Sequence, residues 1–545
     1  LLSGVSGHGA RSFYYPEVAQ QNCNECHMPS MASSDLGSRY LEKLKGLGVH
    51  SHAFPSANTA LAHWMGDKES VERHRKYLQG TLQIDLFGLR EGGSIDGKLQ
   101  SPLGDQATVQ AGETYLLETV LRTMTLGHHF TQGTTDSNQI WIEMTAKQGD
   151  EIIAKSGHRD EREKVDEWSH FVNNFILDRN GERINRRNAQ DIFTPLYNHQ
   201  IPPGAGQTVH YRLEIPSANT QPILVTARLL YRKFDTEYLD YIRRDRDPAV
   251  DPLSLGNPGE PNDLPIVEIA SDTIQLNIED GTDKSVVDQS GGEDVTSDVS
   301  GTMSEKKVVV DPRPLWQRWN DYGIGMLLKG KAELRQAAEA FSEVEKLGRY
   351  DGPLNLARVQ FAEGDLDAAT ESLKRAATME PPPPTWTHSW LSGMVNRQQG
   401  NLRSAADSFT AVLETRVPDR GFDFSLDYVV RNELGLTLID LAQQADVQGS
   451  ESEYRSYLNQ AKLEFEAVLQ ADSENVTAHA NLVEIYSLLG DEKLESLHRE
   501  LHTRYKPDDN AAEVAVPAAR RRYPAANHAA EALVIYDLQR DDTLD

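Results

Sequence analysis

The stretches AEGDLDAATESL (residues 362–373) and QQGNLRSAADSF (residues 398–409) share one arrangement of glycine, small and bulky residues. Gly364 and Gly400 lie 36 residues apart, and each precedes an alanine that is followed four positions later by Leu373 or Phe409. Residues four apart lie on the same face of a helix. The recurrence therefore predicts stacked helical hairpins, in which each bulky side chain packs into the space beside a small one.

The spacing from alanine to bulky residue recurs in four places: Ala337/Phe341, Ala369/Leu373, Ala405/Phe409 and Ala461/Phe465. A period of 36 residues is close to the 34 of the tetratricopeptide repeat. Residues 314–508 are therefore predicted to form an α-solenoid of four such units and a degenerate fifth. Solenoids of this kind present a concave surface that usually binds protein, with an architectural spacer as the alternative.

The amino-terminal stretch NCNECHMPS (residues 22–30) contains the only two cysteines of the chain, Cys23 and Cys26, followed directly by His27. Cys-x-x-Cys-His is the attachment motif of haem c, in which both thiols bind the porphyrin and the histidine binds iron. Thioredoxin-like exchange would need a βαβ context that this stretch lacks. Zinc binding with His50 and His52 would need an unusual spacing. Residues 1–79 are predicted to bind one covalent haem c.

The second axial ligand of the iron separates electron transfer, which a filled position favours, from catalysis at an open one. His52 precedes Ala-Phe-Pro, where the chain turns, and a histidine held beside an aromatic residue and a proline suits a ligand. His52 is therefore the first choice. The alternatives are His8, His50, His63 and His128, with Met65 as a further possibility.

The run FYYPEVAQQNCNECHMP…VHSHAFPSANTA resembles the haem-binding segment of multihaem c-type cytochromes that carry tetratricopeptide repeats. Those proteins show C-x-x-C-H-M-P followed by H-x-H-x-F-P-x-A-N-T, which this chain matches between Cys23 and Thr59. Their motif G-H-x-F-P-T-G reads GHHFTQG here (residues 127–133), with proline and threonine replaced, and only one C-x-x-C-H is present. The resemblance covers roughly residues 5–235 and the repeats. It implies a protein that receives its haem outside the bacterial cytoplasm.

The middle of the chain, residues 80–244, contains short runs such as NQIWIEMTA and VHYRLEI, in which apolar and polar residues alternate. Such runs between turn residues predict an immunoglobulin-like β-sandwich. Residues 245–313 form an acidic linker rich in Pro, Gly and Ser, interrupted by one possible strand, PIVEIASDTIQLNI. Residues 509–545 form a tail that is a candidate cap for the solenoid. The predicted fold class is multidomain α+β.

The composition excludes several functions. The formal charge of −28 argues against nucleic acid and anionic membranes as partners. No run of about 18 apolar residues is present, so no transmembrane helix is expected. The chain begins LLSGVSGHG, which leads us to expect a processed chain without its targeting segment. G-x-S-x-G, Walker and H-E-x-x-H motifs are missing from the sequence, and the protein is predicted not to be an enzyme.

These patterns together predict a periplasmic or extracellular bacterial c-type cytochrome with one haem for electron transfer. Its repeat domain would dock a redox partner protein or copies of the same chain. A structural subunit of an extracellular filament or surface assembly, with haem contacts between subunits, is the alternative. An open iron site that reacts with a small oxidant such as peroxide is a third possibility.

Overall fold

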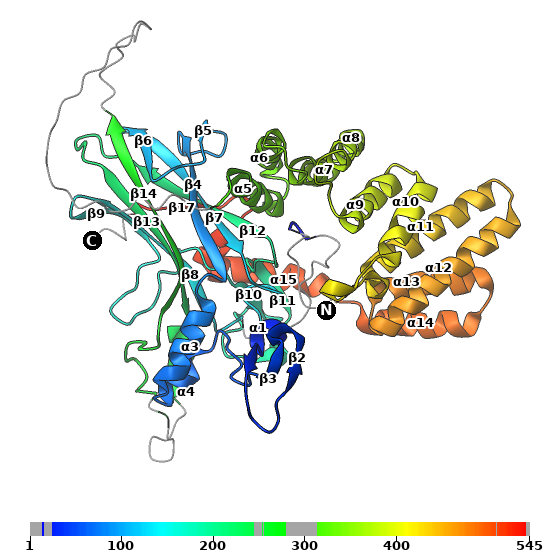
Figure 1. Ribbon diagram of the computed structural model, residues 1–545, viewed down its shortest axis with the longest axis horizontal. Coiled ribbons are helices and arrows are strands. Elements are labelled where there is room, and N and C mark those ends of the chain that lie inside the picture. Colours follow the sequence, from blue (N-terminus) through cyan, green and yellow to red (C-terminus); the bar gives the residue numbers. More distant parts are fainter. Residues whose placement is uncertain are drawn as a thin grey trace, which may run out of the picture.

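The computed structural model describes residues 13–15, 24–133, 135–244, 253, 255–279, 313–507 and 509–540. An N-terminal segment, a two-sheet sandwich and a helical solenoid follow one another along the chain (Figure 1). The solenoid extends away from one side of the sandwich, and the last helices and strand return to the sandwich.

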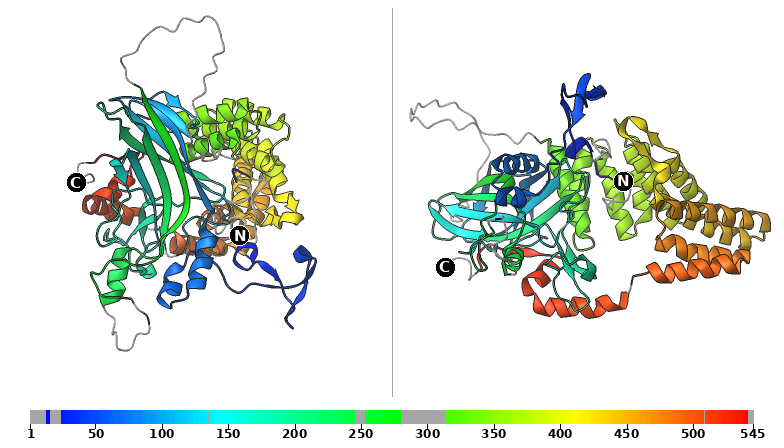
Figure 2. Two further views of the ribbon diagram at one scale, coloured as in Figure 1. Left: turned by 60° about the vertical axis from the view of Figure 1, so that its left-hand side comes forward. Right: turned by 90° about the horizontal axis from the view of Figure 1, so that it is seen from below.

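The N-terminal segment begins with α1 (Asn24–His27) and a small antiparallel sheet in the order β1-β3-β2. Its strands are β1 (Ser30–Ala32), β2 (Arg39–Leu41) and β3 (Gly46–His50), with a 3-10 turn, η2 (Glu42–Leu44), before β3. We call residues 30–50 the flap. Both views of Figure 2 show the flap projecting from the body of the protein. Helices α2 (Thr59–Trp64) and α3 (Lys68–Leu78) then lead into the sandwich.

Two five-stranded sheets form the sandwich. One has the order β17-β12-β7-β4-β5, with β4 (Leu82–Glu91), β5 (Leu99–Gln100), β7 (Thr114–Thr123), β12 (Gly206–Glu214) and β17 (Ile535–Asp537). The other has the order β6-β14-β13-β8-β9, with β6 (Gln106–Gln110), β8 (Gln139–Gln148), β9 (Glu151–Ser156), β13 (Ile223–Arg232) and β14 (Val267–Glu279). Alternating side chains from both sheets, such as Leu86, Leu117, Ile142 and Val225, are buried in one apolar core.

The strand expected inside the linker is β14, and it lies within the sheet. It pairs antiparallel with β13, with Leu276 opposite Ile223, and parallel with β6, with Gln275 opposite Gln106. The sandwich therefore continues to Glu279, well beyond the predicted boundary at residue 244. Most of the sandwich pairs are antiparallel as expected, whereas β6–β14 and β12–β17 are parallel. The immunoglobulin-like arrangement stays a prediction.

Smaller elements flank the sandwich: the hairpin of β10 (Asn174–Leu177) and β11 (Thr194–Asn198), the turn η3 (Ala189–Asp191), and α4 (Thr236–Arg244). Residues 280–312 of the predicted linker lie outside the described residues.

The described part of the solenoid contains five helical hairpins. They are α5 (Leu315–Lys329) with α6 (Leu334–Lys346), α7 (Asp351–Glu363) with α8 (Leu366–Ala377), α9 (Thr385–Gln398) with α10 (Leu402–Glu414), α11 (Tyr428–Val447) with α12 (Glu451–Ala471), and α13 (Val476–Leu489) with α14 (Glu492–Tyr505). An insertion with β15 (Arg416–Val417), η4 (Pro418–Arg420), β16 (Phe422–Asp423) and η5 (Phe424–Leu426) separates α10 from α11.

Close packing inside three hairpins depends on a glycine in the first helix. A Cβ atom at Gly393 of α9 would lie 2.5 Å from the ring of Phe409 on α10. Gly323 opposite Phe341 and Gly435 opposite Phe465 are equally tight, and all three phenylalanines are fully buried. The bulky residues predicted from the sequence therefore pack where the facing helix has no side chain.

The C-terminal tail does not cap the solenoid, so that prediction is wrong. Helix α15 (Asp509–Arg522) packs against β10 and β11, and α16 (Pro524–Ala529) follows it. Strand β17 then pairs parallel with β12, with Ile535 opposite His210. The physical reason is the burial of apolar surface, because Ala519 and Tyr536 are buried against sandwich residues. The right-hand view of Figure 2 shows this return path.

The sandwich and the first hairpin share a single core, which we call the joint. Tyr322 and Ile324 of α5 are buried together with Val209 and Tyr211 of β12. The backbones approach closely, since a Cβ atom at Gly325 would lie 2.3 Å from the Thr208 hydroxyl oxygen. The base of the solenoid is therefore part of the sandwich core.

Candidate functional site

His27 ends helix α1, and its imidazole is held in one orientation. Its Nδ1 lies 3.0 Å from the carbonyl oxygen of Pro55 and 3.3 Å from the hydroxyl of Tyr77. A carbonyl can only accept a hydrogen bond, so Nδ1 carries the hydrogen and Nε2 keeps its lone pair. Cys26 beside it is exposed. The other cysteine of the motif, Cys23, lies outside the described residues, as does His8.

His128 is the histidine that the fold brings to His27. The two rings are parallel within 6°, and their centroids are 6.3 Å apart. The Nδ1 of His128 lies 2.9 Å from the carbonyl oxygen of His129. His128 therefore has the same tautomer as His27, with a lone pair on Nε2.

The separation of the two ring centroids is close to that of two imidazoles bound to one iron. Each metal–nitrogen bond is about 2 Å long, and each nitrogen lies about 1 Å from its ring centroid, so an iron between them requires centroids about 6 Å apart. Carbonyl groups that bind the second ring nitrogen are the usual outer partners of metal-binding histidines. His27 and His128 could thus hold a haem iron, with Cys26 adjacent for a thioether bond.

The other predicted histidines point to different neighbours. His52 is exposed, and its ring lies parallel to that of Phe54 at 6.0 Å. The Nδ1 of His50 lies 2.9 Å from the carbonyl oxygen of Met28, and His63 lies 3.7 Å from the carboxylate of Asp263. Among described residues, the aromatic rings in contact with His27 are those of Tyr77 and His128. The signal for His128 in the sequence was its GHHF motif.

Two further side chains shape this site. Burial raises the pKa of Tyr77 to about 12, so its phenol stays neutral, and the nearby Cys26 acts in the same direction. The backbone N–H of Ser56 donates to Nδ1 of His74 at 3.1 Å, which fixes the loop that carries Pro55. Burial lowers the pKa of His74, which favours this neutral, accepting form.

Two features of the described residues bear on the cofactor and membrane predictions. They contain no group of three or more His, Cys, Asp or Glu side chains that could hold a metal ion, although haem iron needs only two such ligands. The zinc alternative includes Cys23, which lies outside them. No helix in these ranges has both the length and the apolar character needed to span a membrane.

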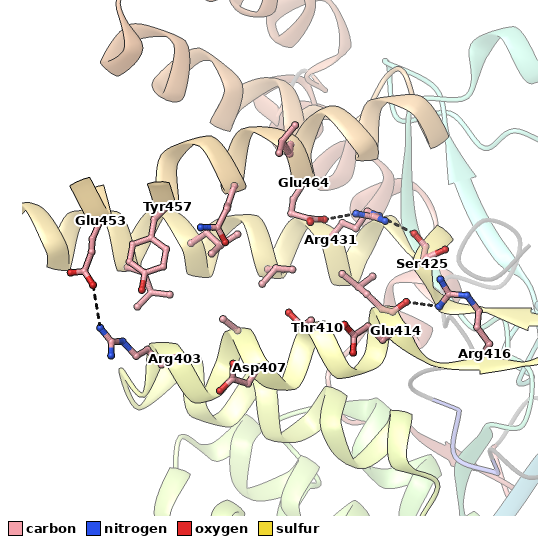
Figure 3. A pocket seen from close by; sticks show the side chains of 17 residues that line it. Arg403, Asp407, Thr410, Glu414, Arg416, Ser425, Arg431, Glu453, Tyr457 and Glu464 are labelled. Carbon is pink, nitrogen blue, oxygen red and sulfur yellow. Dashed lines mark hydrogen bonds and ion pairs between the residues drawn. The ribbon is translucent and has the colours of Figure 1, made fainter. Parts of the chain in front are cut away.

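A groove of about 750 Å³ lies between α10, α11 and α12 of the solenoid (Figure 3). Its lining includes apolar side chains from two helices: Leu413 of α10, and Leu434, Leu438 and Leu441 of α11. Ion pairs Arg403–Glu453 and Arg431–Glu464 link its two sides. Asp407 and Glu414 of α10 are exposed along it and form no ion pair with any described residue. The lining also contains Arg403, Arg416 and Arg431, so the groove is of mixed charge.

Residues near the N-terminus fill the space between the sandwich and the first hairpins. The hydroxyl of Tyr15 donates to the Asp321 carboxylate, and the Arg122 guanidinium lies 3.9 Å from its ring centroid. Tyr14 lies under Arg358 of α7, at 4.6 Å. Both tyrosines are buried. This part of the solenoid is therefore already occupied by its own chain.

The joint contains a network of buried charges that sequence patterns did not indicate. Glu118 accepts from Arg90 at 2.8 Å and lies 2.6 Å from Nδ1 of His210. Nε2 of His210 lies 3.2 Å from Glu333 of the solenoid. Burial opposes protonation of His210, but the two carboxylates prevail and raise its pKa to about 9. No sequence motif marks this network, because its members are far apart in the chain.

Comparisons with known proteins concern the solenoid. No protein-family model matches the chain, and no curated protein matches it. One similar solved structure is MamA AMB-1, at 18% identity and a TM-score of 0.27, which covers 35% of this chain and 90% of that chain. Another is YrrB, titled a TPR protein with an unusual peptide-binding site, at 16% identity and a TM-score of 0.27, which covers 36% of this chain and 89% of that chain. A third is the APC/C hetero-tetramer Cut9–Hcn1, at 14% identity and a TM-score of 0.28, which covers 37% of this chain and 36% of that chain. The five hairpins, three of which have a buried Gly–Phe contact, identify the C-terminal region as helical repeats of the tetratricopeptide type.

Proposed function

We propose that the protein is an extracytoplasmic c-type cytochrome that carries one covalent haem for electron transfer and docks a protein through its solenoid. The observation that carries this proposal is the parallel pair His27 and His128, with centroids 6.3 Å apart and both Nδ1 atoms at backbone carbonyls. The Cys-x-x-Cys-His motif supports a covalent attachment at the same place.

His27 and His128 would hold the haem between them, and an iron held by two histidines would support electron transfer and not catalysis. A haem bound in this way supplies a one-electron carrier. The carbonyls of Pro55 and His129 hold the two rings in the tautomer that binds metal. Covalent attachment takes place outside the bacterial cytoplasm, which supports a periplasmic or extracellular location.

The test is spectroscopic. A pyridine haemochrome spectrum of the purified protein should show a c-type α-band, and the intact mass should exceed that of the polypeptide by one haem. The visible spectrum should be that of a low-spin, six-coordinate iron that does not bind carbon monoxide. A protein without the α-band would contradict the proposal.

Matched variants then assign the second ligand. His128→Ala should convert the iron to a high-spin form that binds carbon monoxide, whereas His52→Ala, at an exposed ring, should leave the spectrum unchanged. The opposite pattern would restore His52 as the ligand.

A structural subunit of an extracellular assembly, with haem contacts between subunits, is a second candidate. It is favoured by the exposed apolar face of the flap, which contains Met31, Tyr40 and Leu47.

A further inference from the structure

The C-terminal end of the chain closes one edge of the sandwich. Strand β17 joins the edge of β12 through three parallel residue pairs, which begin at Ile535 opposite His210. Just beyond β17, the carbonyl oxygen of Leu538 accepts a hydrogen bond from the backbone N–H of Lys155 in β9, at 2.8 Å. We call residues 524–540, which contain α16 and β17, the strap. The strap is therefore attached to both sheets.

A histidine of the sandwich lies directly under the strap. His170 is completely buried, and its Nδ1 lies 3.0 Å from the hydroxyl oxygen of Tyr536 in β17. Its Nε2 lies 3.2 Å from the side-chain oxygen of Gln207 in β12. Because an amide oxygen can only accept, Nε2 carries the hydrogen of a neutral imidazole and the Tyr536 hydroxyl donates to Nδ1. The closed strap therefore fits the uncharged form of His170.

A second histidine stacks on the first. The rings of His199 and His170 are parallel within 19°, and their centroids are 5.0 Å apart. His199 also stacks on Tyr197 at 4.4 Å, and His528 of the strap contacts the ring of Tyr536 at 5.7 Å. Protons on both stacked rings would thus place two positive charges about 5 Å apart beneath the strap.

The surroundings of the stacked pair disfavour protonation. Burial lowers the pKa of His170 well below its usual value and that of His199 to about 3. The cation of Lys329, at the end of α5, acts in the same direction on both rings. The backbone groups of Phe171 and Ala529 act in the opposite direction on His199 but do not prevail. The described groups that shift the pKa of either ring include no carboxylate, so a proton bound here has no counter-charge.

The carboxylates near the strap pair with other cations. The pairs are Glu531 with His528 at 3.7 Å, Asp537 with Arg212 at 3.9 Å, and Asp166 with Arg540 at 3.0 Å. These contacts help to hold the strap, but they lie outside the stacked pair.

We propose that the strap is released from the sandwich when His170 and His199 bind protons. Release gives both imidazoles the contact with water that their charged forms require. It also uncovers the edge of β12 at His210, whose side chain contacts Glu333 of the solenoid, so the effect of acid reaches the joint. The inference does not rest on the haem or on docking by the solenoid.

The pH range of release follows from the two pKa values. Above pH 6.5 both histidines are neutral in either state, so the strap stays closed. Below pH 6.5 the released state binds protons that the closed state does not, and release becomes more favourable. Between pH 7.5 and pH 5.5, each histidine should raise the equilibrium constant for release about tenfold, and the two together about a hundredfold.

The test is hydrogen exchange of the full chain followed by mass spectrometry at pH 7.5, 6.5, 5.5 and 4.5, with rates corrected for the intrinsic effect of pH. Peptides that contain Ile535 to Leu538 should show about a hundredfold rise in opening between pH 7.5 and 5.5. Peptides from β4 of the same sheet should rise far less. An equal rise in β4 would mean that the whole sandwich unfolds, and it would overturn the inference.

Matched variants assign the rise to the stacked pair. His170→Gln removes one titrating group and should reduce the rise to about tenfold. His199→Phe keeps a ring beside Tyr197 and should give the same reduction, which keeps the test valid if His170→Gln does not fold. His502→Gln, at a partly exposed position of α14, is the control and should keep the full rise.

Three further results would overturn the inference. The strap could open equally at pH 7.5 and 5.5, or both variants could keep the hundredfold rise. A rise confined to pH values below 5 would assign release to carboxylates, which titrate near pH 4, and not to the histidines.

Discussion

The joint and the N-terminal segment differ in how their geometry is maintained. In the joint, Glu118, His210 and Tyr322 are fully buried, and each of these three side chains has a polar partner from another element. Between residues 26 and 58, by contrast, only Gly48 and Pro55 are buried. The interactions of the chain itself suffice to position the joint. The side chains of the N-terminal segment, its histidines and apolar residues included, remain accessible to a ligand or to another molecule.

This difference separates stability from function. Substitutions in the joint should change the free energy of unfolding strongly and the proposed site little. Substitutions in the segment should do the reverse, because exposed side chains contribute little to folding. Four measurements can test this contrast, from the largest expected effect to the smallest.

Glu118→Leu should give the largest loss of stability. It leaves Arg90 and His210 buried without their carboxylate, and breaking a buried ion pair in this way costs about 3–5 kcal/mol. Urea unfolding followed by tryptophan emission measures the loss. Glu339→Gln, which removes an exposed partner of Arg335, is the control and should cost under about 0.5 kcal/mol. A loss below about 1 kcal/mol for Glu118→Leu would contradict the role given to the network.

The pH dependence of stability should report the same network. The pKa of His210 is higher in the folded protein, at about 9, than in the unfolded chain, at about 6.5, so the folded state binds this proton more tightly. The stabilisation is complete below pH 6.5 and is lost as pH rises through 9, by about 3 kcal/mol. Urea midpoints at pH 6 and pH 9.5 measure it. His210→Gln should show a much smaller decline, and an equal decline would assign the effect elsewhere.

How far the sequence predicts this molecule depends on the range of the contacts. The 36-residue period identified the solenoid because each hairpin buries its face against neighbours in the sequence. The return of β17 to β12 was missed because more than 300 residues separate the paired strands. No local pattern encodes such a pairing.

The candidate site shows the same limit. Cys-x-x-Cys-His is contiguous, so the sequence alone predicts Cys26 and His27 as site residues. The sequence around the motif predicts His52 as the second ligand, whereas the fold places His128 beside His27 from a loop 101 residues away in the sequence. The GHHF motif makes His128 a candidate ligand, but the motif does not predict that its ring lies beside that of His27.

Gly393→Ala extends the comparison to the solenoid, where no buried charge is involved. The added methyl would lie 2.5 Å from the ring of Phe409, and overpacking of this kind costs about 1–3 kcal/mol. Thermal unfolding monitored by circular dichroism measures the change. Ser404→Ala, at an exposed position of α10, should change stability by under about 0.5 kcal/mol. If Gly393→Ala leaves the stability unchanged, the two helices of the hairpin can move apart without a cost in free energy.

Tyr40→Ser with Leu47→Ser in the flap should give the smallest effect on folding. Both side chains are more than half exposed, so their removal should change the free energy of unfolding by under about 0.5 kcal/mol, measured by urea unfolding. If the protein forms the assembly of the second candidate function, the same double variant should weaken self-association in sedimentation velocity, because it removes apolar area from the exposed face of the flap. Loss of association without loss of stability would show that the flap serves contacts between molecules. Loss of stability would instead mean that the flap already packs within its own chain, and the contrast with the joint would fail.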